Sequence, residues 1–109
     1  MADESIIISI RRYLHALIEE GITPSFGVLF GSYATGRADK WSDIDLIVAA
    51  KHFDGDYQHR DVSLLWRVAG AVDSRIEPIP CGERQWEEDD GTPIYEIARK
   101  EGVVVRMEN

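Results

Sequence analysis

The sequence predicts one small α/β (α+β) domain, in which a mixed sheet of about four strands is covered by helices mainly on one face. The order of periodic segments is helix, strand, strand, helix, strand, helix, strand. The length of 109 residues suits a single core, so one domain is expected over 1–109. With 44% hydrophobic residues in short runs, the composition argues against a disordered chain and against a membrane-spanning helix.

Hydrophobic spacing and breaker residues place the elements of the first half. A helix is expected over 5–20, where apolar residues recur on one helical face before Gly21: Ile7, Ile10, Leu14, Leu17 and Ile18. Strands are expected over 25–30 and 43–50. The Gly-rich polar segment between these strands must turn the chain sharply.

The second half follows the same logic. Residues 51–60 form a polar loop, after which Asp61 can cap a helix that buries Val62, Leu65, Val68 and Val72. A strand is expected over 74–80, and the acidic segment 82–91 is expected to be a short helix or turn. Thr92, Pro93 and Gly102 suit the cap, the first position and the end of a further helix, and a last strand follows over 103–106.

Two aspartates break the hydrophobic pattern at the head of the second strand. Side chains alternate along a strand, so Asp43 and Asp45 lie on one face, about 6.5–7 Å apart along the backbone, while Ile44, Leu46 and Val48 face the core. Two like charges on one face repel unless a cation lies between them. A hard divalent cation with oxygen ligands, Mg²⁺ or alternatively Mn²⁺, is therefore expected there.

A Gly-Ser pair ends the preceding strand. Gly31 permits an abrupt turn, and Gly31 and Ser32 would lead a short helix whose N–H groups attract phosphate, with the Ser32 hydroxyl as a further donor. Phosphoryl chemistry with two metal ions needs a third acid. Glu77 is the best candidate, because it is a charged residue in an apolar strand-like run; Pro78 beside it indicates an edge strand or a bulge.

Gly31-Ser32, ten residues and then Asp43-Ile44-Asp45 resemble the signature of the nucleotidyltransferase superfamily that includes DNA polymerase beta. The whole chain resembles the minimal nucleotidyltransferase (MNT) proteins, the group that contains MNT antitoxins paired with HEPN toxins. The resemblance implies that Gly31 and Ser32 contact a triphosphate and that Asp43 and Asp45 bind Mg²⁺. It also implies that Glu77 completes the metal site and deprotonates an acceptor hydroxyl, although this position is more often aspartate in the superfamily.

The resemblance implies a Mg²⁺-dependent nucleotidyltransferase that moves AMP from ATP to a hydroxyl of a helical HEPN-type partner protein, as an antitoxin. Two alternatives stay open. One is a catalytically weak or inactive binding module that neutralises a partner by covering it, with an apolar patch around Trp86, Ile94 and Tyr95. The other is a subunit of a small-molecule (aminoglycoside-type) nucleotidyltransferase. A template-directed polymerase is rejected, because the chain is too short for further subdomains and too acidic to grip a duplex.

Several further residues near these motifs have two readings. Arg37 is a candidate contact for phosphate oxygens, although a solvated loop residue is at least as expected. Trp41 is expected to cover the strand entrance, with stacking on a nucleobase as the alternative. Packing in the core or at an interface is expected for Trp66 and Trp86. The three histidines, His15, His52 and His59, show no metal-ligand spacing and are expected at the surface or in loops.

Charge and cysteine content bear on partners and compartment. Twenty acidic and twelve basic residues give a formal net charge of −8, which opposes binding to duplex nucleic acid. The acidic N-terminus is unlike a secretory signal, and the single Cys81 agrees with a reducing compartment, so a cytoplasmic protein without a membrane partner is expected. Homo-oligomerisation stays open.

Overall fold

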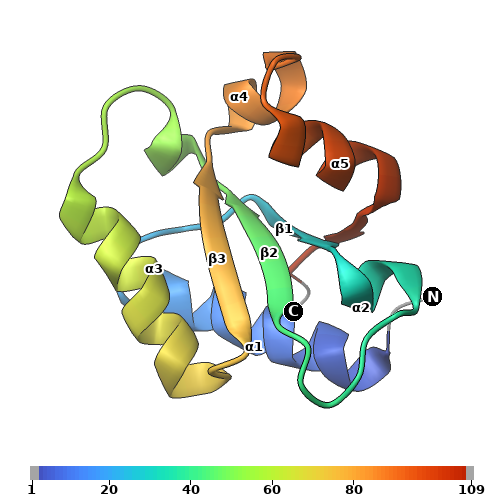
Figure 1. Ribbon diagram of the computed structural model, residues 1–109. Helices are drawn as coiled ribbons and strands as arrows, with labels where there is room; N and C mark the ends of the chain where they lie inside the picture. Colours follow the sequence, from blue (N-terminus) through green and yellow to red (C-terminus); the bar gives the residue numbers. More distant parts are fainter. Residues whose placement is uncertain (1–2, 108–109) are drawn as a thin grey trace.

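The computed structural model describes residues 3–107, which form four strands and six helical segments (Figure 1). In chain order these are α1 (Glu4–Glu19), β1 (Phe26–Phe30), α2 (Ser32–Thr35), β2 (Ile44–Ala49), the 3₁₀ turn η1 (Lys51–Phe53), α3 (His59–Val72), β3 (Ile76–Cys81), α4 (Glu83–Glu88), α5 (Pro93–Glu101) and β4 (Val103–Val105). The predicted element order and the predicted mixed four-stranded sheet are confirmed.

The sheet order is β3-β2-β1-β4, with β2 and β3 parallel and the other two pairs antiparallel. β3 is an edge strand, as Pro78 predicts. The carbonyls of Arg75 and Cys81 accept hydrogen bonds from Ile44 and Ala50, so odd-numbered residues of this strand turn their polar groups toward β2. Pro78 and Pro80, which lack an N–H, therefore turn their backbone toward the outer edge.

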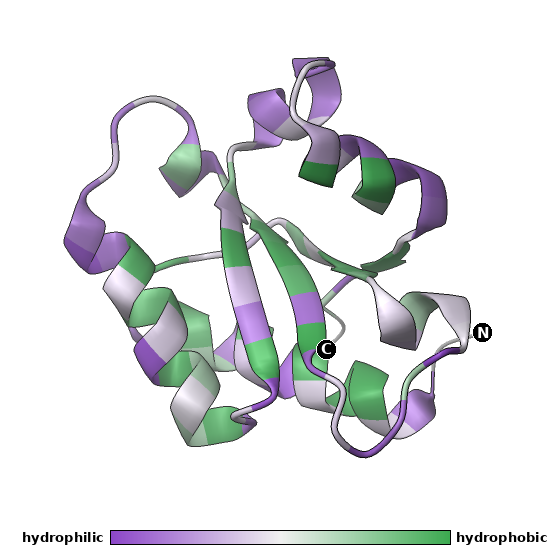
Figure 2. Ribbon diagram, viewed as in Figure 1, coloured by the Kyte–Doolittle hydropathy of each residue, from purple (hydrophilic) through white to green (hydrophobic). Residues whose placement is uncertain are grey.

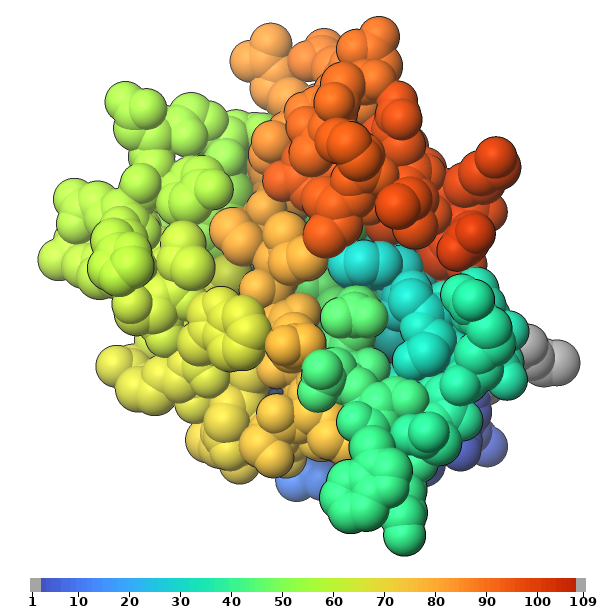
Figure 3. Space-filling model, in the orientation of Figure 1, coloured from blue at the N-terminus to red at the C-terminus, as the bar shows by residue number. Residues whose placement is uncertain are grey.

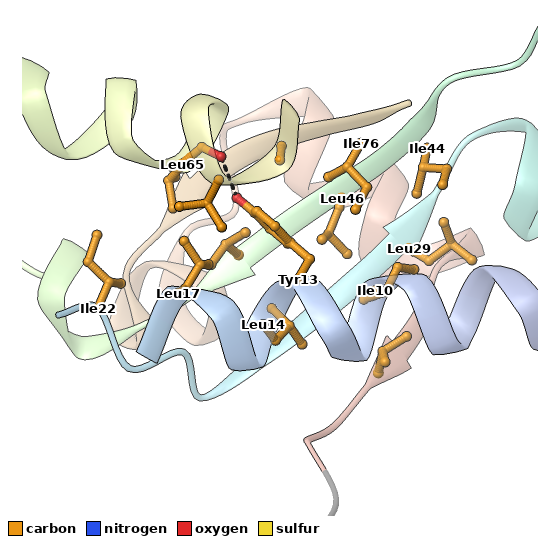
Figure 4. Close-up of a cluster of buried hydrophobic side chains, with 14 of the residues drawn as sticks. Ile10, Tyr13, Leu14, Leu17, Ile22, Leu29, Ile44, Leu46, Leu65 and Ile76 are labelled. Carbon is orange, nitrogen blue, oxygen red and sulfur yellow. Dashed lines mark hydrogen bonds between the residues drawn. The ribbon is translucent and has the colours of Figure 1, made fainter. Parts of the chain in front are cut away.

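Helices α1 and α3 cover one face of the sheet and enclose the larger core (Figure 4). From β2, Ile44, Leu46 and Val48 all point into this core and are fully buried, as the alternation predicts. The hydroxyl of Tyr13 on α1 donates to the carbonyl of Leu65 on α3 at 2.9 Å, which joins the two helices inside the core. Burial raises the pKa of the Tyr13 phenol.

The buried stripe of α1 is rotated slightly from the predicted one. Ile10, Leu14 and Leu17 are buried as predicted, but Ile6 and Tyr13 complete the stripe, whereas Ile7 is half-buried and Ile18 is 41% exposed. The reason is that α1 packs against both the sheet and α3, so the face defined by Ile6 and Tyr13 lies deeper than the face defined by Ile18.

Helix α3 begins three residues earlier than predicted, with Gln58 as its cap. Asp61 lies in its first turn and is not the cap; its carboxylate accepts from the N–H of Gln58, the residue that precedes the helix, at 2.9 Å. The aspartate therefore still satisfies an N-terminal donor from inside the helix. Trp66 is not part of the core, because the residue is 48% exposed, and its packing at an interface stays a prediction.

Helix α5 covers part of the opposite face and, as predicted, begins after Thr92 and ends at Gly102. A smaller cluster lies beneath it: Val28, Phe30, Ile47, Cys81, Tyr95 and Ala98. Helix α4 precedes it, and the carboxylate of Asp54, thirty residues earlier, accepts from the N–H of Arg84 in its first turn. No helix within residues 3–107 combines the length and the apolar character needed to cross a membrane.

Candidate functional site

Three carboxylates meet where β2 and β3 begin. Asp45 on β2 lies opposite Glu77 on β3 in the parallel ladder and opposite Phe30 on the other side, while Asp43 immediately precedes β2. Figure 2 shows a hydrophilic segment on each of these two otherwise apolar strands, side by side. The fold therefore brings together the three acids that the sequence singled out, on the face that α5 covers only in part.

The pKa values of Asp45 and Glu77 are both raised above the ordinary values of carboxyl groups. Partial burial raises the pKa of Asp45, and the nearby charge of Asp43 raises it further. Desolvation also raises the pKa of Glu77, together with the charge of Asp43, a hydrogen bond with the Asp43 carboxyl and the charge of Asp45. Negative charge is thus concentrated here at a cost that a cation would relieve.

The donor set fits a hard divalent cation, because it consists of carboxylate oxygens without thiol or imidazole. Within residues 3–107, however, no three acidic, histidine or cysteine side chains are grouped tightly enough to hold a metal ion as they stand. Carboxylates that repel one another favour divergent rotamers. Side-chain rotation of Asp43, Asp45 and Glu77 is therefore required before all three could share one cation.

Gly31 connects β1 to α2 directly beside Asp45. Its φ of 76° and ψ of −152° belong to a region that essentially only glycine adopts. A Cβ atom at this position would overlap Oδ2 of Asp45 and would lie 3.3 Å from its Cγ. The absence of a side chain at Gly31 thus allows the backbone turn and leaves room for the Asp45 carboxylate.

The four-residue helix α2 follows this turn. The amides of Ala34 and Thr35 donate to the Gly31 carbonyl, and the hydroxyl of Thr35 does so at 3.2 Å. The amides of Ser32 and Tyr33 precede these donors in the first turn, where a helix offers no internal acceptor. They and the Ser32 hydroxyl are the groups of this segment that can bind phosphate oxygens.

Arg37 follows α2 on the exposed connection to β2. Its Nε donates to the hydroxyl of Thr35 at 2.9 Å, which ties the base of the side chain to the turn. The bond uses Nε and leaves the two terminal nitrogens to other acceptors. The Arg37 amide also donates to the Ser32 carbonyl at 3.0 Å, so the residue is held beside the start of α2.

Asp39 organises the connection between α2 and β2, and the sequence analysis did not single it out. Its carboxylate accepts from the N–H of Trp41 at 2.8 Å, its carbonyl accepts from the N–H of Ser42, and its own N–H donates to the Ser42 hydroxyl. The segment Asp-Lys-Trp-Ser carries the signal for this turn, because an Asp side chain readily accepts from the backbone two residues later. The hydroxyl of Tyr33 also donates to the Asp39 carbonyl at 3.4 Å.

This turn presents Trp41 to solvent. The prediction that Trp41 covers the strand entrance is wrong, because the residue is 81% exposed. Its backbone is held by Asp39, and the ammonium of Lys40 lies 5.0 Å from the centre of the indole ring. The physical reason is the tight turn, which places Trp41 at its tip, where other elements do not cover the side chain.

The other candidate residues lie apart from the carboxylates. His15 is exposed on α1, His59 is the first residue of α3, and Nε2 of His52 lies 3.3 Å from Asp61. Trp86 packs as predicted, with its ring edge-on to Phe26.

The fold agrees with a sequence comparison. Residues 10–100 match the model of the nucleotidyltransferase domain family. The chain belongs to this family. No curated protein gives a significant match to the sequence.

Solved structures share the nucleotidyltransferase fold with this chain. A toxin–antitoxin crystallised with AMP-PNP is 21% identical, with a TM-score of 0.61, and the match covers 91% of this chain and 74% of that one. A Sulfolobus solfataricus protein inferred to be a nucleotidyltransferase is 16% identical, with a TM-score of 0.63 and coverage of 92% and 78%. A mutant of the toxin–antitoxin MntA-HpeT is 22% identical, with a TM-score of 0.58 and coverage of 100% and 76%.

Proposed function

We propose that this nucleotidyltransferase-family protein is a Mg²⁺-dependent adenylyltransferase that moves AMP from ATP to a hydroxyl of a helical HEPN-type partner protein. In this proposal it acts as the antitoxin of a toxin–antitoxin pair. Family membership supports the reaction class. The partner is proposed from the sequence resemblance to MNT antitoxins and from two structural neighbours that are toxin–antitoxins.

The observation that carries the proposal is the register of the two parallel strands. Asp45 and Glu77 are direct neighbours across β2 and β3, Asp43 lies close enough to share a hydrogen bond with Glu77, and Gly31 gives Asp45 its space. A structural role would not explain three acids in mutual repulsion at the start of two buried strands. Their proximity costs folding free energy, and a binding function offsets such a cost.

Each residue has a role that follows from its position. Asp43 and Asp45, with Glu77, would hold two Mg²⁺ ions, or alternatively Mn²⁺, which neutralise phosphate charge when bound. The Ser32 and Tyr33 amides, the Ser32 hydroxyl and Arg37 would bind the β- and γ-phosphates of ATP. Glu77 would accept the proton of the acceptor hydroxyl as its oxygen attacks the α-phosphorus, while the bond to the β-phosphate breaks and pyrophosphate leaves.

The position of Glu77 suits a general base. Burial and the charges of Asp43 and Asp45 raise the pKa of Glu77, whereas bound Mg²⁺ would lower it, so the role of base is proposed from the position of Glu77. Glu77 is half-buried on an edge strand, so one side of it stays open to an incoming hydroxyl. A partner protein would supply that hydroxyl on a projecting segment.

The test uses the full chain, the protein encoded by the neighbouring gene, Mg²⁺ and ATP labelled at the α-phosphate. We expect label on the neighbour with α-labelled ATP and none with γ-labelled ATP, because only the AMP moiety is retained. Asp43→Asn/Asp45→Asn should abolish labelling and Glu77→Gln should reduce it strongly. Asp90→Asn, an exposed acid on the connection to α5, is the matched control and should label as the wild type does.

A binding module is the second candidate function, and one observation favours it. The three carboxylates are not grouped tightly enough to hold a metal ion without rearrangement. If the protein forms a tight complex with its neighbour, the complex survives Asp43→Asn/Asp45→Asn, and no label is transferred, the adenylyltransferase proposal fails. Neutralisation by covering the partner is then the function.

The proposed subunit of a small-molecule nucleotidyltransferase is tested in the same reaction. Replacing the neighbour protein by an aminoglycoside and recovering labelled small molecule would establish that activity instead. The expected result is no labelled aminoglycoside, because in the proposed reaction the partner protein supplies the acceptor hydroxyl.

A further inference from the structure

The exposed indole of Trp41 has no packing role within the described chain. It is the most exposed of the large hydrophobic residues, at 81%, although an indole buries more apolar area than any other side chain when it finds a partner. Figure 1 shows the connection from α2 to β2 projecting past the start of β2, and Figure 3 shows this segment standing out from the face. The position of Trp41 therefore points to a ligand that covers it.

The turn holds Trp41 in a defined place. Asp39 accepts from the Trp41 amide, pairs with Ser42 on the other side of the tip, and is bonded through its carbonyl to Tyr33 of α2. A side chain whose backbone is fixed in this way loses little further backbone freedom when a ligand binds. Such preorganisation is typical of a binding platform.

The charge around Trp41 indicates what kind of ligand it would accept. Lys40 places its ammonium 5.0 Å from the indole centre, and Arg37 lies four residues before Trp41 on the same connection. An ammonium beside an exposed aromatic ring, in a chain of net charge −8, suits a ligand that has both a flat π-system and negative charge. A nucleotide has this combination, with its base as the π-system and its phosphates as the charge.

The distance along the chain is short enough. Trp41 precedes Asp43 by two residues, so their Cα atoms are at most about 7 Å apart. When the α-phosphate of a nucleotide lies at the carboxylates, its base lies beyond it by the length of the ribose. A side chain as long as tryptophan, two residues from Asp43, can reach a base at that distance.

We infer that Trp41 is the nucleobase platform of the site. Its indole stacks on the base, and the Lys40 ammonium forms an ion pair with the phosphates. The inference rests on the proposed function only for the position of the α-phosphate. Stacking recognises the size of a π-system and not its hydrogen-bonding edge. The site therefore prefers purine over pyrimidine nucleotides and discriminates poorly between ATP and GTP.

The test measures binding, so it does not depend on group transfer. The full chain with Mg²⁺ is titrated calorimetrically with ATP, GTP, CTP and inorganic tripolyphosphate. We expect ATP and GTP to bind with affinities within about threefold of each other, and CTP more weakly. Trp41→Ala should weaken ATP and GTP about tenfold and leave tripolyphosphate unchanged, because only the base contact is lost.

Three variants serve as controls. Trp41→Phe should restore most of the affinity for ATP, because a phenyl ring also stacks. Trp66→Ala removes another half-exposed indole, on α3 away from the carboxylates, and should bind ATP as the wild type does. Lys40→Ala should weaken ATP and tripolyphosphate by the same factor, because it removes charge and not stacking.

The inference is overturned by unchanged ATP binding in Trp41→Ala, by an equal loss for ATP and tripolyphosphate, or by a wild-type protein that binds no nucleotide. If Trp41→Ala binds ATP as the wild type does but labels the partner protein poorly, Trp41 contacts the partner protein and not the nucleobase. Partner labelling that persists in Trp41→Ala at saturating ATP, with unchanged ATP affinity, would overturn the platform and leave the adenylyltransferase proposal intact.

Discussion

Replacing Gly31 by alanine tests the packing of backbone against carboxylate at the candidate site. The substitution adds one methyl group to a residue at φ 76° and ψ −152°. That methyl group would overlap Oδ2 of Asp45. Gly36 provides a matched control, because it ends α2 at a similar φ of 75° with ψ of 16°, and a Cβ there meets nothing within 4 Å.

The two glycines separate backbone strain from steric overlap. Gly36→Ala forces alanine into the left-handed helical region, which costs about 1–2 kcal/mol of the free energy of unfolding. Gly31→Ala forces alanine into a less accessible region, which costs about 1–3 kcal/mol, and in addition displaces the Asp45 carboxylate. We expect a total loss of about 2–4 kcal/mol, a large part of the stability of a domain of this size.

Urea unfolding followed by tryptophan fluorescence measures both variants. The overlap contribution is isolated by repeating the pair in an Asp45→Ala background, where Oδ2 is absent and the difference between the two glycine variants should shrink. Label transfer at a temperature where Gly31→Ala is still folded should be lost in that variant and retained in Gly36→Ala. A Gly31→Ala protein that is no less stable than Gly36→Ala would refute the close approach of Gly31 to Asp45.

Three further predictions concern stability, each read from an unfolding curve. Tyr13→Phe removes the buried hydrogen bond to Leu65 and should lower the free energy of unfolding by about 1 kcal/mol at unchanged fold by circular dichroism. Asp54→Ala removes the acceptor at the start of α4 and should cost about 1 kcal/mol, whereas Asp56→Ala in the same loop should cost little. Hydrogen bonds from Arg75 hold the pKa of Asp73 below its usual value, so this pair stabilises the fold above about pH 4 and the stabilisation is lost as pH falls through the folded pKa. In Asp73→Asn, the free energy of unfolding measured with urea should fall less between pH 5 and 3 than it does in the wild type. A fall as steep as in the wild type would contradict the assignment.

The element order and the sheet could be predicted because the chain carries strong local signals. Asp43 and Asp45 on alternate positions, with Ile44, Leu46 and Val48 between and after them, predicted both the strand and its buried face. The parallel register that sets Asp45 opposite Glu77 could not be read from spacing, because it depends on how α3 packs across the sheet.

The errors of the sequence analysis concern features that tertiary contacts decide. Tyr13 was missed as a core residue because a phenol reads as polar until a partner such as the Leu65 carbonyl is found for it. Trp41 does not cover the strand entrance and Trp66 does not enter the core, because both residues are exposed. Exposure of this kind has no local sequence signal, whereas the turn around Asp39 does have one.

The two prolines of β3 determine how other molecules can reach the carboxylates. An edge strand with regular N–H groups can pair with a strand of another molecule by backbone hydrogen bonding. Such an added strand would block access to Glu77 from the edge of the sheet. Pro78 and Pro80 turn residues without an N–H toward that edge, so the ladder of donors is broken beside the half-buried glutamate. Sheet extension is thereby discouraged, and the approach to Glu77 stays open for a side chain presented by another surface.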